Sequence, residues 1–314
     1  MRAVAADSLD VDPTVQEVPD PRPGAGELLV EVKAAAINPF DHKVARGEIL
    51  PDLPRDFPYV YGGDFAGVVT ALGEGAGSFS VGDKVFGQFL SNPGGHGSNA
   101  EYVAVPEKGA VTAIPEGVSF AEAASIGTAG MTAQQIVDSA NLNAGESLLI
   151  IGAGGGVGSF LIQLAAARDL RVIAATRGDE RARLGGFGAA RTIDVDEESL
   201  GEAVRDEYPD GVDALVDLAS QDSEVFAQHA ALVGDGGVAL TTNFVADESR
   251  TPGNIEVINF GMQGSASSLD TVAAAIAAAT LKAPIEYSVS IDEAPERIAE
   301  LRSGKGRGKA VIVF

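Results

Sequence analysis

The chain contains no cysteine among its 314 residues and only three histidines. The absence of cysteine excludes disulfide bonds, thiolate nucleophiles and every zinc site that uses cysteine ligands. The histidines are His42, His96 and His229. His96 lies in a glycine-rich stretch and is interpreted as a loop residue, whereas His229 lies in a helical pattern and is expected to be structural. Their spacing does not indicate a metal site, so we predict no metal ligands.

Basic residues are also scarce, with 22 Lys+Arg against 45 Asp+Glu and a formal net charge of −23. Nucleic-acid binding is disfavoured, because phosphate backbones require a basic surface. A disordered acidic chain is excluded by the hydrophobic content of 45%. Acidic residues are spread along the whole sequence, and molar salt would screen their repulsion within about 3 Å. This pattern predicts a globular protein adapted to high salt, as in a halophile.

Long apolar runs are missing as well. A membrane-spanning helix needs about 20 consecutive apolar residues, and the alanine-rich stretch 271–281 is shorter than that. The first residues, "MRAVAADSLDVDP", lack the apolar centre of a signal peptide. We therefore expect a cytoplasmic protein with no membrane partner. The length of the chain favours two domains.

From residue 147 onward, short β-branched runs alternate with helical patterns, from "SLLIIG" to "IEVINFGM". This alternation predicts an α/β fold with a doubly wound parallel sheet of six strands, preceded by an amphipathic helix over 119–141. Before residue 119, strand-like runs separated by Gly, Pro and Asp indicate an antiparallel or mixed β domain. The segment after 284 has the same character. We therefore predict a β domain formed by 1–121 and 267–314, with 122–266 inserted as the parallel sheet.

A glycine turn follows the first strand of the predicted sheet. The sequence "GAGGGVG" fits the frame Ala153-x-Gly155-x-x-Gly158, a variant of G-x-G-x-x-G with alanine first. Gly155 would let a pyrophosphate approach the backbone, and Gly158 would let the helix pack closely on the strand. The N–H groups of Gly156, Val157 and Gly158 would bind the anion at the helix start. Because the turn lies between a strand and a helix, we predict a dinucleotide site.

The end of the second strand indicates which dinucleotide is bound. NAD-binding chains carry an acidic residue there, which would repel a 2′-phosphate. Here the residues are Thr176 and Arg177, followed by Arg181. Threonine does not repel a phosphate, and arginine can bind one with two hydrogen bonds. We therefore predict NADP(H), with solvated surface arginines at a helix start as the alternative.

Several motifs in a fixed order extend this pattern over nearly the whole chain. They are 18–47 with N-P-x-D-x-K, 59–87 with G-G-D-F-A-G, "NAEYVAVPE" at 99–107, the segment Ala121–Val137, the glycine turn within 144–159, "GVDALVDLAS" at 211–220 and "GKAVIVF" at 308–314. In these motifs the chain resembles the medium-chain dehydrogenase/reductases, in particular their zinc-independent quinone oxidoreductase branch.

The resemblance implies a GroES-like β domain with an inserted Rossmann domain, and a substrate held in the cleft between them. It also implies homodimers joined through the edge strand of the Rossmann sheet, here "IEVINFG". Alcohol dehydrogenases of the wider family bind catalytic zinc through cysteine and histidine. Where a cysteine would lie, this chain has "NPFDHK". Since alcohol oxidation needs the metal to polarise oxygen, we expect reduction of an already activated acceptor.

The resemblance also implies residues near the nicotinamide. Asn38 and Thr132 match family positions there, although Asn38 could cap the following helix and Thr132 could cap a turn. Asp41 and Lys43 are candidates for proton relay, with an exposed helix-face pair as the alternative. Asn243 and Phe244 follow the fifth strand and are expected to border the nicotinamide pocket, because ligands bind at the carboxyl ends of sheet strands.

The sequence thus predicts an NADPH-dependent reductase of a small quinone or enone. Two alternatives stay open: a ketone or aldehyde reductase that works without zinc, and a catalytically silent NADPH-binding protein of the kind found among lens crystallins. Enoyl-thioester reductases of the family carry a tyrosine shortly after the N-P-x-D motif, and "ARGEILPDLP" has none. Enoyl-thioester reduction is therefore disfavoured.

Overall fold

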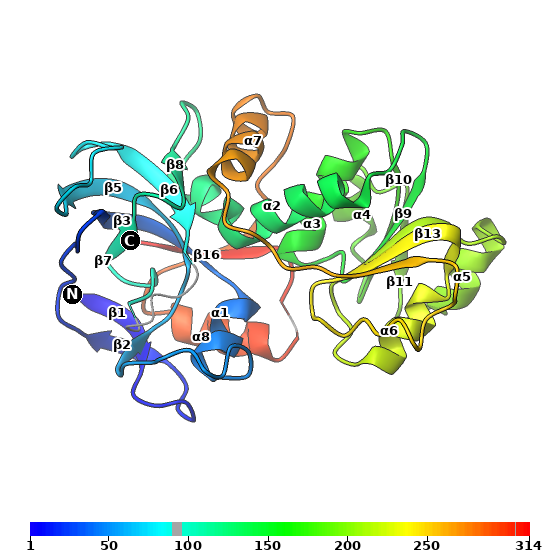
Figure 1. Ribbon diagram of the computed structural model, residues 1–314, viewed down its shortest axis with the longest axis horizontal. Helices are drawn as coiled ribbons and strands as arrows, with labels where there is room; N and C mark the ends of the chain where they lie inside the picture. Colours follow the sequence, from blue (N-terminus) through cyan, green and yellow to red (C-terminus); the bar gives the residue numbers. More distant parts are fainter. Residues whose placement is uncertain (90–95, 305) are drawn as a thin grey trace. The chain divides into compact units, whose positions relative to one another are not determined.

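The computed structural model describes residues 1–89, 96–304 and 306–314 (Figure 1). The chain divides into two compact units, one formed by Met1–Met131 with Gly264–Phe314 and the other by Thr132–Gln263. The fold is α/β, with a β-rich unit interrupted by a doubly wound parallel sheet, and this confirms the predicted fold class.

The first unit contains two sheets. The three-stranded sheet has the order β2-β1-β4, and the seven-stranded sheet has the order β15-β16-β3-β5-β6-β8, with β7 paired to β3. Buried and half-buried residues alternate along β3, as expected for a mostly antiparallel sheet with one face on the core. The strands are β1 (Arg2–Ala6), β2 (Thr14–Glu17), β3 (Glu27–Ile37), β4 (Tyr59–Val60), β5 (Asp64–Leu72), β6 (Lys84–Gln88), β7 (Tyr102–Pro106), β8 (Ala110–Ala113), β15 (Ile285–Val289) and β16 (Lys309–Val313).

The last strand of the chain, β16, pairs with β3 near the start of the chain. β16, drawn in red in Figure 1, runs antiparallel to β3, and Ala310 lies opposite Ile37. Through this pairing the C-terminal segment lies in the same sheet as β3. The pairing also places Lys309, which precedes Ala310, beside Asn38, which follows Ile37. The helices of this unit include α1 (Pro39–Ala45), α7 (Ala266–Ala277) and α8 (Ala294–Arg302).

The second unit is built on a six-stranded sheet with the order β11-β10-β9-β12-β13-β14, in which every pairing is parallel. Its central strand β9, "SLLII", is buried throughout, as is typical of parallel sheets covered on both faces. The six predicted strands are confirmed. They are β9 (Ser147–Ile151), β10 (Arg171–Thr176), β11 (Arg191–Asp194), β12 (Val212–Asp217), β13 (Val233–Thr241) and β14 (Glu256–Asn259).

Helices cover both faces of this sheet (Figure 1). On one face, Leu149 and Ile151 of β9 pack with Val204 of α5 and Phe226 of α6. Because side chains alternate along a strand, the intervening residues of β9 point to the other face, where α3 packs on β9 and β10. The helices of this unit are α3 (Gly156–Ala166), α4 (Arg181–Gly185), α5 (Leu200–Glu207) and α6 (Ser223–Ala230).

The helix predicted over 119–141 is α2 (Phe120–Ala140), and it is broken at Gly127, whose φ is −22° and ψ is −105°. The break is caused by Asp64, the first residue of β5. A Cβ at Gly127 would come within 2.4 Å of the Asp64 side chain, and the N–H of Thr128 donates to Asp64 Oδ1 at 2.8 Å. Asp64 therefore acts as the cap of the second half of α2. Among the described residues, no helix is both long and apolar enough to span a bilayer.

Candidate functional site

The glycine turn links β9 to α3 and has two different steric environments. A Cβ at Gly158 would lie 2.6 Å from Cα of Ala153, so glycine is required there for close packing. At Gly155 the nearest atom to such a Cβ is the carbonyl oxygen of Gly152 at 3.5 Å, an ordinary contact. The protein itself therefore leaves room above Gly155, as a backbone-bound ligand would require.

The first turn of α3 provides free N–H groups. The helical hydrogen bonds begin with Ser159, whose N–H donates to the oxygen of Gly155 at 2.9 Å. The N–H groups of Gly156, Val157 and Gly158 precede it and have no acceptor within the helix. Together with the helix dipole they form an anion site that fits a pyrophosphate. The residues present therefore fit a bound dinucleotide.

The predicted ribose-binding residues lie at the carboxyl end of β10. Thr176 is the last residue of the strand, and Arg177 and Arg181 are exposed. Within the part of the chain that the structure describes, neither guanidinium forms an ion pair with a carboxylate. Both arginines are therefore accessible to a ligand, and their role in binding NADP(H) stays a prediction.

Two carboxylates near this end of the sheet are already engaged. Asp194, at the end of β11 beside Thr176, accepts hydrogen bonds at Oδ1 from the N–H groups of Gly178 at 2.9 Å and Asp196 at 3.1 Å. Glu180 forms an ion pair with Arg183 at 2.5 Å, and the two side chains are 6% and 14% exposed. Neither carboxylate takes the place of the missing acidic residue at position 176.

Sequence reasoning missed Arg183. Its guanidinium donates to the carbonyl oxygen of Gly154 at 2.8 Å and to Oγ of Ser159 at 3.2 Å. The arginine therefore ties α4 to the glycine turn. Its helical phase could have distinguished it from Arg181, because the two residues lie on different sides of α4.

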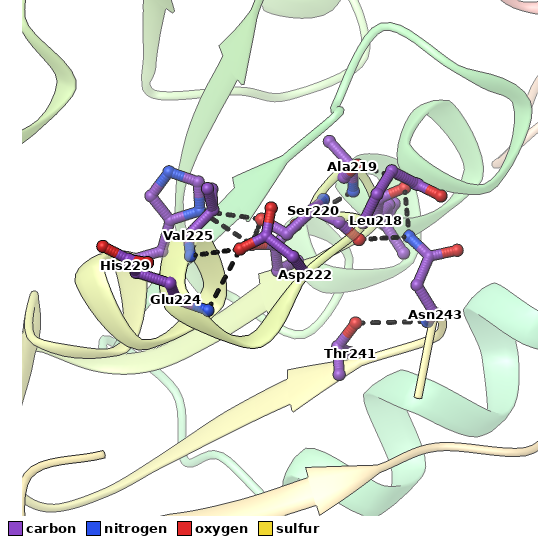
Figure 2. Close-up of polar contacts among 11 residues, drawn as sticks. Leu218, Ala219, Ser220, Asp222, Glu224, Val225, His229, Thr241 and Asn243 are labelled. Atoms are coloured by element: carbon purple, nitrogen blue, oxygen red, sulfur yellow. Dashed lines mark hydrogen bonds and ion pairs between the residues drawn. The ribbon is translucent and has the colours of Figure 1, made fainter. Parts of the chain in front are cut away.

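The ends of β12 and β13 are joined by a hydrogen-bond network (Figure 2). The Asn243 side chain donates to the carbonyl oxygens of Ser220 at 3.0 Å and Leu218 at 3.4 Å. Asp217 is fully buried and contacts Nδ1 of His229 at 2.7 Å and Oγ of Ser220 at 2.6 Å. Burial alone would raise the pKa of Asp217, but these hydrogen bonds hold it below its usual value. His229 therefore helps to hold the Asp217 carboxylate in place at the end of β12.

Phe244 follows this network, and its backbone has a conformation that is rare for residues other than glycine. Its φ is +58° and the residue is 65% exposed. Left-handed backbone at a non-glycine residue costs energy and is often found at ligand sites. With Asn243, Phe244 lies just past the carboxyl end of β13, where ligands of such sheets bind. Their place beside a nicotinamide stays a prediction.

A buried polar cluster occupies the first unit. It consists of Asn38, which precedes α1, Asp41 on α1, Asp64 at the start of β5 and Lys309 at the start of β16. The Asn38 amide nitrogen donates to Asp64 Oδ2 at 2.9 Å and to Asp41 Oδ2 at 3.1 Å. Asn38 occupies the N-cap position of α1, although its side chain makes no capping bond to the helix.

The pKa of Asp41 is raised above that of an ordinary carboxyl group. Burial, reinforced by repulsion from Asp64, raises its pKa to about 7, although the Asn38 amide and Lys309 act in the opposite direction. Asp41 is half-buried, whereas Asp64 is fully buried. Burial also raises the pKa of Asp64 and lowers that of Lys309. The two carboxylates therefore titrate as a coupled pair.

The other two predicted catalytic residues lie outside this cluster. Lys43 is two residues after Asp41 on α1, a spacing that places the two side chains on different sides of a helix. Thr132 is buried inside α2, which continues to Ala140, so its alternative role as a turn cap is wrong. The catalytic roles of both residues stay predictions.

The donor set does not fit a family-type zinc site. The chain has no cysteine, and no three His, Asp or Glu side chains group into a metal-binding cluster in residues 1–89, 96–304 and 306–314. The nearest histidine in sequence to the cluster, His42, is 6% exposed and packs beside Tyr61. Burial lowers the pKa of His42, which favours its neutral form.

The fold and these sites define a dinucleotide-binding α/β protein of the oxidoreductase class. Residues 24–116 match the alcohol dehydrogenase GroES-like domain, and residues 156–279 match the zinc-binding dehydrogenase domain. A 2-methylene-furan-3-one reductase of Solanum lycopersicum is 31% identical over 97% of this chain and 76% of its own length. The chain belongs to the medium-chain dehydrogenase/reductase family, as the sequence motifs predicted.

Two further similarities concern proteins named for quinones. The chloroplastic quinone-oxidoreductase QR1 of Triphysaria versicolor is 35% identical over 65% of this chain, and the match spans 63% of that relative. The chain thus covers just under two thirds of the relative's length. The solved quinone oxidoreductase of Coxiella burnetii is 27% identical, with a TM-score of 0.88, over 100% of this chain and 99% of the other. These relatives place the chain among the quinone oxidoreductase-like members of the family.

Proposed function

We propose that the chain is an NADPH-dependent reductase of a quinone or an activated enone and that it works without zinc. The observation that carries the proposal is the polar cluster around Asp41, a half-buried carboxyl group that accepts a hydrogen bond from the Asn38 amide at 3.1 Å and whose pKa burial raises to about 7. A group that titrates near neutral pH can donate a proton during turnover and recover it afterwards. This chemistry suits an acceptor that is already activated and needs no metal.

NADP(H) would be held by the second unit. The N–H groups of Gly156, Val157 and Gly158 would bind the pyrophosphate, and Thr176 with Arg177 and Arg181 would face the adenosine ribose. Three observations support NADP(H) over NAD(H). Position 176 lacks a carboxylate, the neighbouring carboxylates of Asp194 and Glu180 are engaged, and both arginines are exposed.

When bound, the nicotinamide supplies a hydride to the β-carbon of an enone or to a quinone. The acceptor gains two electrons, its C=C π bond breaks in the case of an enone, and negative charge develops on its oxygen. Protonated Asp41 would donate a hydrogen bond to that oxygen and then transfer its proton to the reduced acceptor. Asp41 is left as a carboxylate and takes a proton from solvent before the next turnover.

Asn38 would orient Asp41 in this scheme. Its two amide hydrogens face Asp41 and Asp64, and its oxygen accepts from Lys309 at 2.6 Å. The amide is therefore engaged within the cluster, which suits a positioning role. Zinc would have no part in the scheme, because the chain offers no cysteine ligand and its described residues no alternative donor cluster.

We also infer a homodimer, as the family resemblance implies. β14 is one of the two edge strands of the parallel sheet and pairs only with β13 among the described strands. An edge strand presents free N–H and C=O groups that a second copy can pair with. Light scattering should give twice the 32.0 kDa mass of the chain, and a monomer would contradict this assembly.

An acceptor panel tests the function. NADPH oxidation is followed in molar KCl with 9,10-phenanthrenequinone, an alkyl enone and a simple ketone. We expect turnover with the first two, and a loss of about 100-fold or more in kcat for Asp41→Asn. The exposed control Asp52→Asn should behave as the unaltered chain.

Two outcomes would favour the alternatives. Faster reduction of the ketone would indicate a ketone or aldehyde reductase. Enhanced NADPH fluorescence on binding, with no oxidation by any acceptor, would indicate a catalytically silent binding protein.

A further inference from the structure

Lys309 is a fully buried lysine in a chain that has few basic residues. Its side chain is 3% exposed, and lysine is rarely buried unless it is paired. It begins β16, whose next residue, Ala310, lies opposite Ile37 of β3. The strand pairing therefore brings the C-terminal end of the chain beside Asn38 and the start of α1.

The contacts of Lys309 fix the orientation of the Asn38 amide. Its Nζ donates to Oδ1 of Asn38 at 2.6 Å and to the carbonyl oxygen of Ile37 at 3.4 Å. An ammonium group only donates hydrogen bonds, so the atom that faces it must be the amide oxygen. The amide nitrogen then points away from Lys309, toward Asp41 and Asp64.

The cluster holds one ammonium and two carboxyl groups. Lys309 Nζ lies 3.8 Å from Asp64 Oδ2, and Asp64 Oδ1 also accepts from the N–H and hydroxyl of Thr128. Asp64 is therefore held by donors from three segments, namely Asn38 before α1, Thr128 on α2 and Lys309 on β16. The charged or polar groups that act on Asp41 are Asn38 on its own segment, Asp64 from β5 and Lys309 from β16.

We propose that Lys309 is a positioning residue of the reductase: it locks the Asn38 amide, and from its place beside Asp64 it sets the electrostatic environment of Asp41. This role rests on the proposed function of Asp41 as the proton donor. Lys309 contacts Asn38 and Asp64. It acts on Asp41 and does not itself contact the acceptor in this scheme.

The two neighbours of Asp41 should act in opposite directions. Lys309 lowers the pKa of Asp41 and Asp64 raises it. Asp41 must be protonated to donate, so turnover falls as pH rises through its pKa. In Lys309→Met this fall should move to higher pH by roughly one unit or more, and in Asp64→Asn it should move to lower pH. A purely structural role would not produce shifts of opposite sign.

The test uses the full chain and two readouts. The first is the pH profile of kcat for NADPH oxidation by an alkyl enone. The second is the titration of the Asp41 carboxyl carbon by ¹³C NMR, which needs no turnover. The control is Lys33→Met, which removes the same charge from a 35%-exposed position on β3. The control should leave both curves unchanged, while NADPH binding should persist in all three variants.

The outcomes separate this role from the proposed function. If Asp41 titrates at the same pH in Lys309→Met as in the unaltered chain, the role of Lys309 is overturned even where turnover is intact. If Lys309→Met does not fold, Asp64→Asn decides, and an unchanged or raised titration of Asp41 overturns the role. If no acceptor is reduced by the unaltered chain, the function fails, whereas opposite shifts in the NMR titration still support control of Asp41 by Lys309.

Discussion

The guanidinium of Arg183 donates a hydrogen bond to the carbonyl oxygen of Gly154 at 2.8 Å, and thereby holds the glycine turn from the side of α4. The same guanidinium pairs with the buried Glu180. In Arg183→Met the turn loses this bond and Glu180 loses its ion pair with Arg183. Breaking a mostly buried ion pair from one side costs on the order of 3 kcal/mol, so the urea midpoint should fall.

The double variant Arg183→Met with Glu180→Leu provides the control. Replacing both members of a buried pair by apolar residues is often nearly neutral for stability. The midpoint should therefore recover in the double variant, while NADPH and NADH binding remain weakened alike because the turn is no longer held. A midpoint as low as that of the single variant would contradict the assigned role of the ion pair.

Arg177 is expected to recognise the 2′-phosphate of NADPH. A charge-assisted hydrogen bond contributes about 1.5–3 kcal/mol, so Arg177→Ala should weaken NADPH binding roughly 10- to 150-fold. NADH lacks the phosphate, and its affinity should barely change. Fluorescence titration measures both, with the exposed Arg205→Ala as a matched control. Equal losses for the two cofactors would show that Arg177 has another role.

The two glycines of the turn should respond differently to alanine. In Gly158→Ala the new Cβ would lie 2.6 Å from Cα of Ala153, and overpacking of this kind costs about 1–3 kcal/mol. In Gly155→Ala the Cβ meets only an ordinary contact at 3.5 Å. We expect Gly158→Ala to lower the melting temperature, and Gly155→Ala to keep it while losing roughly tenfold or more in NADPH affinity. A stable Gly158→Ala, or a Gly155→Ala with full affinity, would contradict this reading of the turn.

His42 should make the fold sensitive to mild acid. Burial lowers the pKa of His42 in the folded chain, whereas a histidine in the unfolded chain has a pKa near 6.5. The unfolded state therefore binds the proton more readily, and the free energy of unfolding falls as pH drops below about 6.5. His42→Leu should lose less stability between pH 7.5 and 5.5 than the unaltered chain, measured by urea unfolding. The variant His96→Gln, at an exposed position, serves as the control. A loss of stability in His42→Leu equal to that of the unaltered chain would contradict the prediction.

Local patterns were enough to predict the parallel sheet and its turn. A strand, a glycine turn and a helix lie within about 20 residues of sequence around Gly155, so periodicity and turn chemistry identify them. The helix over 119–141 was predicted without its break, because the break at Gly127 depends on Asp64 from a distant strand. The prediction that the surface is adapted to high salt stays a prediction.

The polar cluster was only partly predictable. Asn38 and Asp41 belong to one motif and were found together, but Lys309 is 271 residues from Asn38. Only the pairing of β16 with β3 brings it there, and its register is a tertiary property. Likewise, Asn38 stands where a helix cap is expected, and its side chain is drawn instead to the carboxylates of Asp41 and Asp64.

We propose that the reduction depends on a carboxyl group of the protein and not on a metal. The most direct measurement is the rate of NADPH oxidation by 9,10-phenanthrenequinone before and after dialysis against a strong chelator, and again after zinc is added. We predict the same rate in all three samples, together with a rate that falls as pH rises through about 7. A rate abolished by the chelator and restored by zinc would contradict the claim.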